Sequence, residues 1–194
     1  MKPVIADELL PVTIYDRVRA RLRPLFIVEK DRRRLPVGQH LTLLFENGRT
    51  VWYQVQEMIR AERMTEAGAI ETELSTYNEL LPRAGELAAT LLIEYADPAE
   101  RDIELHRLVG LEQHLWITID GRRTVAQFDM QQTSTDQISA VQFVRFPVGL
   151  TEERFLELAR AGRIAVEADH QHMSARTLIE GSVAVALAED LRAD

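Results

Sequence analysis

The sequence contains no cysteine among its 194 residues. This absence excludes disulfides, thiolate zinc sites, iron–sulfur ligation and cysteine nucleophiles from the chain. No run approaches the roughly 18 continuous apolar residues of a membrane-spanning helix, and the N-terminus lacks an apolar signal region. We therefore expect a cytoplasmic protein that does not act in a membrane.

The sequence motifs that mark common enzyme classes are also missing. No GxGxxG or GxxxxGK[ST] phosphate loop occurs. The tripeptide Glu180-Gly181-Ser182 does not fit the GxSxG elbow of a serine hydrolase. The sequence alone therefore predicts no particular cofactor or reaction.

Charge is unevenly distributed along the chain, whose net charge is −8. Residues 1–34 carry nine Lys/Arg and five Asp/Glu, whereas the remaining 160 residues carry 14 and 26. An acidic main body argues against general nucleic-acid binding. The basic N-terminal segment is suited to docking on an acidic surface, including the rest of this chain.

Composition predicts one soluble domain. Hydrophobic residues make up 46% and charged residues 28%, which is ordinary for a globular protein and sufficient for a core without disulfide or metal staples. We expect a single α+β domain over residues 1–194. Within it, residues 1–36 form a basic helical N-terminal segment and residues 37–194 the main body.

The N-terminal segment is expected to form two helical runs, with the helix broken or kinked at Pro24 between them. The run Arg32-Arg33-Arg34 is then expected to be a solvated helix end. After it, Asn47-Gly48 is the strongest short hairpin signal, because a type I′ turn needs positive φ at both central residues. A two-residue turn there would place His40 opposite Val55, at the start of a helix over residues 56–66.

The rest of the chain groups strands and helices instead of alternating them strictly. Strands are expected at residues 87–95, 114–119, 123–128, 138–148, 164–168 and 174–179. Helices are expected at residues 70–80, 99–109, 151–161 and 183–191. This order predicts an α+β fold with a largely antiparallel sheet, N-terminal helices and helices packed on one side.

Several segments together resemble a bacterial family catalogued as domain of unknown function 3501. They are the GxH strand at 38–40, YQVQEMIRAER at 53–63, Tyr77-Asn78 before Pro82, AATLLIEYADPAER at 88–101, GLE at 110–112 and SAVQFVRF at 139–146. The resemblance implies a genomic context beside rubrerythrin-like and iron–sulfur proteins, and hence a redox or iron-protein partner. Two positions depart from the family pattern: Gln142 replaces a frequent His, and Gln171-His172-Met173 replaces Pro-Ala-Tyr.

One polar surface is the first candidate binding site. It comprises His40, Gln56, Glu57, Arg60, Glu62 and Arg63. A His and a carboxylate can do acid–base work or bind a divalent metal, and the arginines can hold an anion. The alternative is a helix face of Glu–Arg pairs and a His in a polar corner.

A metal is the second possibility. In a strand, His170 and His172 point the same way, which suits a metal ligand pair. The weak candidate set for a divalent cation is therefore His40, Glu57, His170 and His172. The alternative is that residues 169–172 form an exposed loop or a strand end.

Three function classes remain open. The first is an accessory or binding protein that works with a redox or iron protein. The second is a metal-dependent or acid–base enzyme with its site around His40 and Glu57. The third is a homo-oligomeric structural or interaction protein whose basic N-terminal helix docks on an acidic neighbour.

Overall fold

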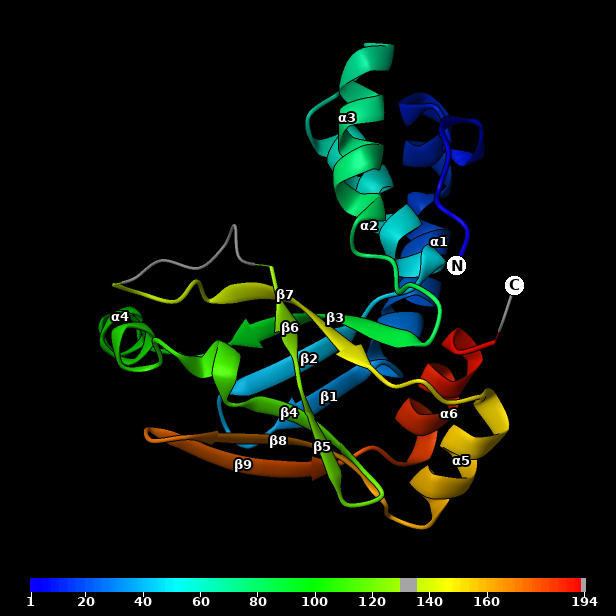
Figure 1. Ribbon diagram of the computed structural model, residues 1–194. Coiled ribbons are helices and arrows are strands. Elements are labelled where there is room, and N and C mark those ends of the chain that lie inside the picture. The colour runs from blue at the N-terminus through cyan, green and yellow to red at the C-terminus, as the bar shows by residue number, and fades with distance from the viewer. Residues whose placement is uncertain (130–135, 193–194) are drawn as a thin grey trace.

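The computed structural model describes residues 1–129 and 136–192. The chain forms a helical arm that stands on a body of two antiparallel sheets (Figure 1). The predicted α+β fold with antiparallel sheets and N-terminal helices is confirmed. No helix of the described ranges is long and apolar enough to cross a membrane.

Three helices and a short 3-10 turn form the arm. They are η1 (Ala6–Glu8), α1 (Val12–Asp31), α2 (Gly48–Ala61) and α3 (Ala67–Asn78). The predicted break at Pro24 is wrong, because α1 runs through it. Pro24 and Ala20 are both exposed, so water can satisfy the Ala20 carbonyl group that Pro24 leaves without its helical partner.

The first sheet has the order β1-β2-β3-β7-β6. Its strands are β1 (Arg34–Val37), β2 (Leu41–Phe45), β3 (Glu86–Ile93), β7 (Val141–Pro147) and β6 (Gln127–Phe128). Side chains alternate between its faces. Leu41, Leu43 and Phe45 therefore point into the main core, whereas Thr42 and Leu44 face the other way.

The second sheet has the order β5-β4-β8-β9. Its strands are β5 (Arg122–Val125), β4 (Leu115–Ile119), β8 (Ile164–His170) and β9 (Met173–Leu178). The chain passes from this sheet to the first at Ala126, whose N–H donates to the Leu115 carbonyl. The apolar faces of both sheets share one buried cluster, so the body is a sandwich.

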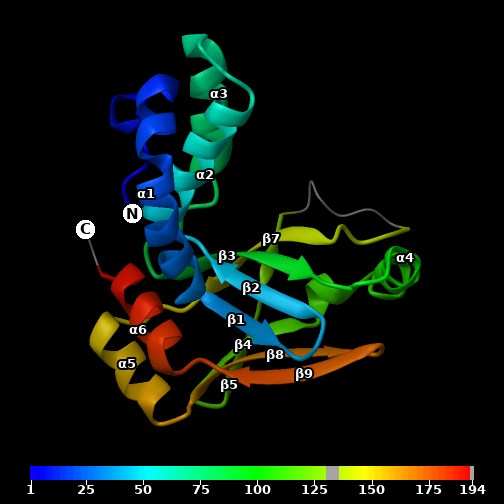
Figure 2. The ribbon, with the colours of Figure 1, turned by 180° about the vertical axis from the view of Figure 1, so that it is seen from behind.

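Short helices cover the two ends of this sandwich (Figure 2). One end has α4 (Pro98–Arg107) and the turn η2 (Leu111–Gln113), and the other has α5 (Glu152–Arg160) and α6 (Gly181–Asp190). Asp120-Gly121 joins β4 to β5 as predicted, with φ of 53° and 78°. Both angles are positive, as a type I′ hairpin turn requires.

The predicted hairpin at Asn47-Gly48 is wrong. Asn47 is instead the N-cap of α2, and its side chain accepts a hydrogen bond from the Thr50 N–H at 2.9 Å. Strand β2 pairs with β1 and β3. Residues 49–55 are helical because Val51, Val55 and Ile59 recur every four residues and bury one helical stripe.

Candidate functional site

The polar face of α2 packs against α1. The Tyr15 hydroxyl donates to Glu57 at 2.6 Å, and the Arg19 guanidinium donates to both Glu57 oxygens at 2.8 and 2.7 Å. The hydrogen bond from Arg19, together with that from Tyr15, lowers the pKa of Glu57 despite its partial burial. Burial and the neighbouring carboxylate raise the pKa of Tyr15. Glu57 is therefore an ionised link between two helices.

The neighbouring residues extend the same helix contact. Gln56 is buried, and its amide exchanges two hydrogen bonds with the backbone of Leu10 at 2.8 and 3.0 Å. Arg60 donates to Asp16 at 2.6 Å. Glu62 and Arg63 are exposed at the end of α2. Gln56, Glu57 and Arg60 thus join α2 to the rest of the arm, and a binding role for the six-residue set stays a prediction.

His40 does not meet α2. It lies just before β2, stacks on Tyr95 with ring centroids 4.1 Å apart, and places Nδ1 3.0 Å from the Glu94 carbonyl oxygen. The predicted proximity to Val55 and Glu57 is wrong, because it rested on the hairpin register and residues 49–55 form a helix. Strand β2 separates His40 from α2.

His170 and His172 lie on different elements with their ring centroids 5.7 Å apart, and their role as a metal-ligand pair stays a prediction. His170 ends β8 and is buried, whereas His172 lies in the exposed turn to β9. The His172 N–H donates to Nδ1 of His170 at 3.3 Å, and Nε2 of His170 lies 3.2 Å from the Val109 carbonyl. Burial lowers the pKa of His170, so a neutral ring satisfies both contacts.

Asp169 lies beside this turn and is held by three side chains. The Trp116 indole donates at 2.9 Å, Arg123 donates at 2.7 Å, and Nδ1 of His114 lies 3.2 Å away. The hydrogen bonds from Trp116, Arg123 and His114 lower the pKa of Asp169 to about 2.

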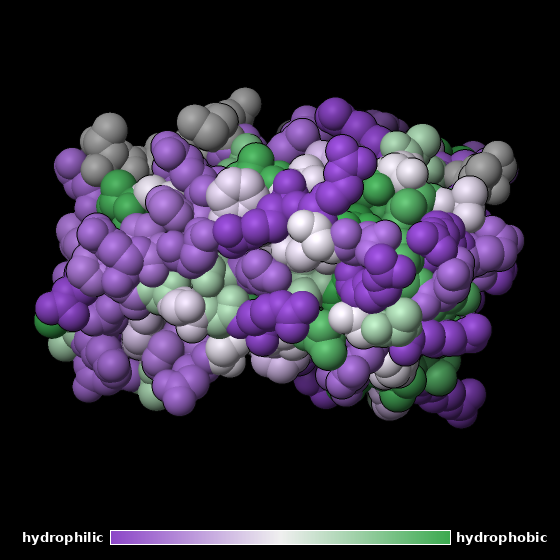
Figure 3. All heavy atoms as spheres, turned by 60° about the horizontal axis from the view of Figure 1, so that its bottom comes forward, coloured by the Kyte–Doolittle hydropathy of each residue, from purple (hydrophilic) through white to green (hydrophobic). Residues whose placement is uncertain are grey.

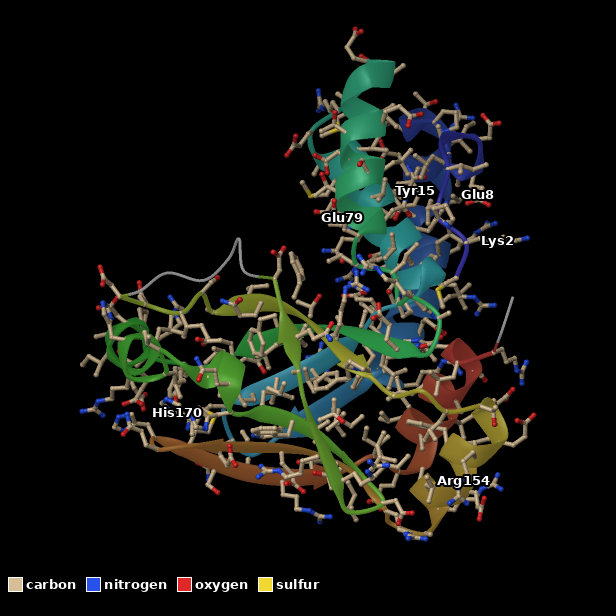
Figure 4. All side chains as sticks on the ribbon, viewed as in Figure 1. Lys2, Glu8, Tyr15, Glu79, Arg154 and His170 are labelled. Carbon is tan, nitrogen blue, oxygen red and sulfur yellow. The ribbon has the colours of Figure 1, made fainter. Side chains whose placement is uncertain are left out.

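The four predicted metal ligands do not converge. His170 lies at the α4 end of the sandwich, and Tyr15, which marks the position of Glu57, lies in the arm (Figure 4). Residues 1–129 and 136–192 contain no group of three or more His, Asp or Glu arranged to hold a metal ion.

The structure reveals a buried polar network where β2 becomes α2. Glu29 accepts hydrogen bonds from Arg32 at 2.9 Å, Arg33 at 2.7 Å and Asn47 at 2.8 Å. Arg33 is only 1% exposed and also pairs with Asp190 of α6. The predicted solvated helix end is therefore wrong for Arg33, whose charge is neutralised by two buried carboxylates.

The pKa values of these carboxylates shift in opposite directions. Burial opposes ionisation of Glu29, but the hydrogen bonds from Arg32, Arg33 and Asn47 lower its pKa to about 2. Burial raises the pKa of Asp190 to about 6 despite its contact with Arg33. The network is therefore an ion cluster whose charges depend on one another.

Glu46 continues the network to the outer face of the first sheet. It is 2% exposed, and its carboxylate accepts hydrogen bonds from the hydroxyls of Thr50 at 2.5 Å and Thr90 at 2.7 Å. Thr50 in turn contacts Asn47, which contacts Glu29. Sequence reasoning missed this cluster, although Asn47 followed three residues later by Thr50 is a helix N-cap spacing.

Glu46 borders a groove of about 670 Å³ between the arm and the first sheet. We call it the arm groove. One wall is the end of α3 and the loop after it, including Thr76, Leu80 and Arg83, and the other is β3, β6 and β7, including Phe143. Figure 4 shows Glu79 at the lower end of α3, above these strands. The groove is lined by apolar residues such as Leu80 and Phe143 and by charged residues of both signs, among them Glu46, Glu79 and Arg83.

A second hollow of about 500 Å³ adjoins the arm groove and extends it toward the N-terminus. The two share Glu79, Arg83 and Arg145. Arg145 is engaged, since it donates to the Leu81 carbonyl at 3.0 Å and to Glu86 at 2.5 Å. The Arg83 guanidinium, by contrast, is exposed and has no ion-pair partner in the described part of the chain.

The model of the family described as "Protein of unknown function (DUF3501)" matches residues 3–191. The chain belongs to the DUF3501 family. This agrees with the resemblance seen in the sequence segments, and the match covers both the arm and the body of this DUF3501 protein.

A solved relative has the same fold as this DUF3501 chain. It is described as the crystal structure of a novel protein of unknown function from Burkholderia pseudomallei K96243. It is 33% identical, with a TM-score of 0.87 over 98% of this chain and 100% of that chain. No curated protein matches the sequence.

Gln142 is the departure from the family pattern that the structure places most clearly. It belongs to β7 and is fully buried on the sandwich side of the strand, where its amide N–H donates to the Ser139 carbonyl at 3.2 Å. Its side chain lies in the core of the sandwich, whereas Glu57 lies in the arm.

Proposed function

We propose that the protein is an accessory binding protein that receives a segment of a partner protein in the arm groove. The observation that carries this proposal is the groove's continuity with the second hollow through Glu79, Arg83 and Arg145. A long hollow of this kind fits an extended segment better than a compact ligand. The segment would place apolar side chains over Phe143 and Leu80 and an anionic group beside Arg83.

The choice of partner rests on the family. The resemblance to DUF3501 proteins implies a genomic context of rubrerythrin-like and iron–sulfur proteins, and this supports a redox or iron metalloprotein as the partner. The charge of Arg83 is consistent with an acidic segment of such a partner, because electrostatic complementarity guides specific association.

A site-specific cross-linking experiment tests the proposal. A photo-reactive amino acid replaces Thr76, which is exposed and lines the groove, and in a matched control it replaces Glu153, which is exposed on α5. After irradiation in cells of the native host, we expect a cross-linked species from position 76 that contains iron by metal analysis. Equal cross-linking from both positions, or a species without iron, would refute the proposal.

A charge reversal provides the second readout. Arg83→Glu should reduce the cross-link from position 76 by about tenfold, because two like charges replace an attractive pair, whereas Arg83→Lys should largely retain it. Arg101→Glu on α4 is the control, since Arg101 is also exposed and lies outside the groove. Loss of the cross-link in the Arg101 variant alone would contradict the assigned site.

A further inference from the structure

A second surface lies on α1, away from the arm groove. Ile14, Arg17, Arg21, Leu25 and Val28 follow one another at intervals of three or four residues, which places them in one stripe of about 21 Å along the helix. Leu25 and Val28 are each 65% exposed and Ile14 is 43% exposed. We call these five residues the α1 stripe.

All five residues of the α1 stripe are exposed in the described part of the chain. Other sides of α1 supply the internal contacts, through Tyr15 and Arg19 to α2 and through Glu29 to the buried network. Arg17 and Arg21 are exposed and have no ion-pair partner among residues 1–129 and 136–192. Two charges and three apolar side chains on one line are therefore available to a partner.

An exposed apolar residue of α6 lies beyond an ion pair at the C-terminal end of the stripe. Arg32 lies one turn beyond Val28 and pairs with Glu189 at 2.7 Å. Val185 lies one turn before Glu189 on α6 and is 45% exposed. Figure 3 shows apolar side chains among polar ones toward the α5 and α6 end of the molecule. The Arg32–Glu189 ion pair therefore separates Val28 of the stripe from Val185 of α6.

The charges decide which partner fits. Arg17 and Arg21 are one helical turn apart, and this spacing matches two carboxylates one turn apart on an opposing helix. The apolar residues provide a ridge that can pack into a groove on the surface of the opposing helix. We propose that the α1 stripe docks an acidic amphipathic helix of a partner protein.

A second copy of this chain fits less well. The stripe is centred on Arg21, so two copies that packed their α1 stripes about a twofold axis would place Arg21 against Arg21. Like charges in contact disfavour association. An anionic membrane fits less well too, because a membrane-bound helix has its basic residues beside the apolar face, whereas Arg17 and Arg21 lie within it.

The test uses a designed helical peptide of about 20 residues that presents leucines and glutamates at the stripe's spacing. Binding to the full chain is measured by fluorescence anisotropy. We expect the peptide to bind, and Arg17→Glu/Arg21→Glu to weaken binding by about tenfold or more. Arg23→Glu is the matched control, since Arg23 is also exposed and unpaired among the described residues but lies on another side of α1.

A charge swap separates recognition from damage to the fold. The same peptide with lysine in place of glutamate should bind the Arg17→Glu/Arg21→Glu chain better than it binds the original chain. Three outcomes would overturn the proposal. They are equal peptide binding by the double and control variants, stripe-dependent binding of anionic lipid vesicles without peptide binding, and a stripe-dependent dimer in sedimentation.

Discussion

Glu29 shows how one buried residue can hold three elements together. It belongs to α1, it accepts from Asn47 at the start of α2, and it shares Arg33 with Asp190 of α6. A buried carboxylate without such donors would be costly. Here several charged and polar donors offset the loss of hydration, and the low pKa of Glu29 reflects this.

Glu29→Gln should therefore change how stability depends on pH. The pKa of Glu29 is lowered from 4.5 to about 2, so its contribution is fully present above pH 4.5 and is lost as pH falls toward 2. The difference between these values corresponds to about 3 kcal/mol. In urea unfolding, we expect the variant to be less stable by about this amount at pH 7, and the difference to shrink between pH 4.5 and pH 2.

Glu153→Gln is the control for this prediction, because Glu153 is exposed on α5 and forms no ion pair within 4 Å among the described residues. Its stability should parallel that of the original chain at every pH. A Glu29→Gln variant whose deficit stays constant from pH 7 to pH 2 would mean that ionisation of Glu29 does not contribute to stability.

Among the elements, α2 is the one whose identity the sequence leaves ambiguous. Asn-Gly favours a type I′ turn, but Asn is also a preferred N-cap residue and Gly is tolerated at the next position. The tertiary contact from the Asn47 amide to Glu29 favours the helix. That contact joins residues 18 apart, so no local pattern could reveal it.

Two substitutions distinguish a helix start from a hairpin turn. Gly48 has no positive φ and a Cβ there would meet only Met1, at 3.8 Å. Gly48→Ala should therefore raise the free energy of unfolding by up to about 1 kcal/mol. Asn47→Ala should lower it by about 2 kcal/mol, because both the cap and a donor to Glu29 are lost. Thermal unfolding checks both.

A hairpin turn at Asn47-Gly48 would give a different result for Gly48→Ala. In a type I′ turn Gly48 would have positive φ, so Gly48→Ala would be clearly destabilising. A loss of stability in that variant would contradict the N-cap assignment. Gly68→Ala is a control, since Gly68 lies in α3 with no atom near its Cβ position and should likewise gain stability.

Most strands and helices could be predicted from the sequence, but β1 (Arg34–Val37) and the start of α2 could not, and neither could the site. Alternating apolar residues and the turn at Asp120-Gly121 predicted the β4–β5 hairpin, which depends on neighbours in sequence. The predicted proximity of His40 to α2 depended on the strand register set by a turn at Asn47-Gly48. It failed because that turn does not form. Glu46 and Arg83 meet at the arm groove only through the packing of α3 over β3 and β7.

In the whole molecule, the buried network ties the arm to the body. Arg33 lies between α1 and β1 and pairs with Asp190 of α6, while Arg32 pairs with Glu189. The same ion cluster joins α1, α2 and α6. Because a buried charge left without its partner is strongly destabilising, the arm and the body should unfold together.

The two tryptophans can test this coupling. Trp52 lies in α2 of the arm and Trp116 in β4 of the body. Trp116→Phe leaves only Trp52 as a probe of the arm, and Trp52→Phe leaves only Trp116 as a probe of the body. When urea unfolding is followed by fluorescence, the two chains should have the same midpoint urea concentration. Adding Arg33→Ala should cost about 3–5 kcal/mol. It should also move the Trp52 midpoint below that of Trp116, because the arm loses its buried anchor on α6.

Arg154→Ala is the control for this change, since among the described residues Arg154 forms an ion pair only with the exposed Glu157 on its own helix. It should leave the two midpoints together, because a surface ion pair contributes little. If the two midpoints already differ in the chain with Arg33 intact, the network does not couple the arm to the body. If they stay equal after Arg33→Ala, the coupling comes instead from the contacts between α2 and the first sheet, such as Thr50 with Glu46.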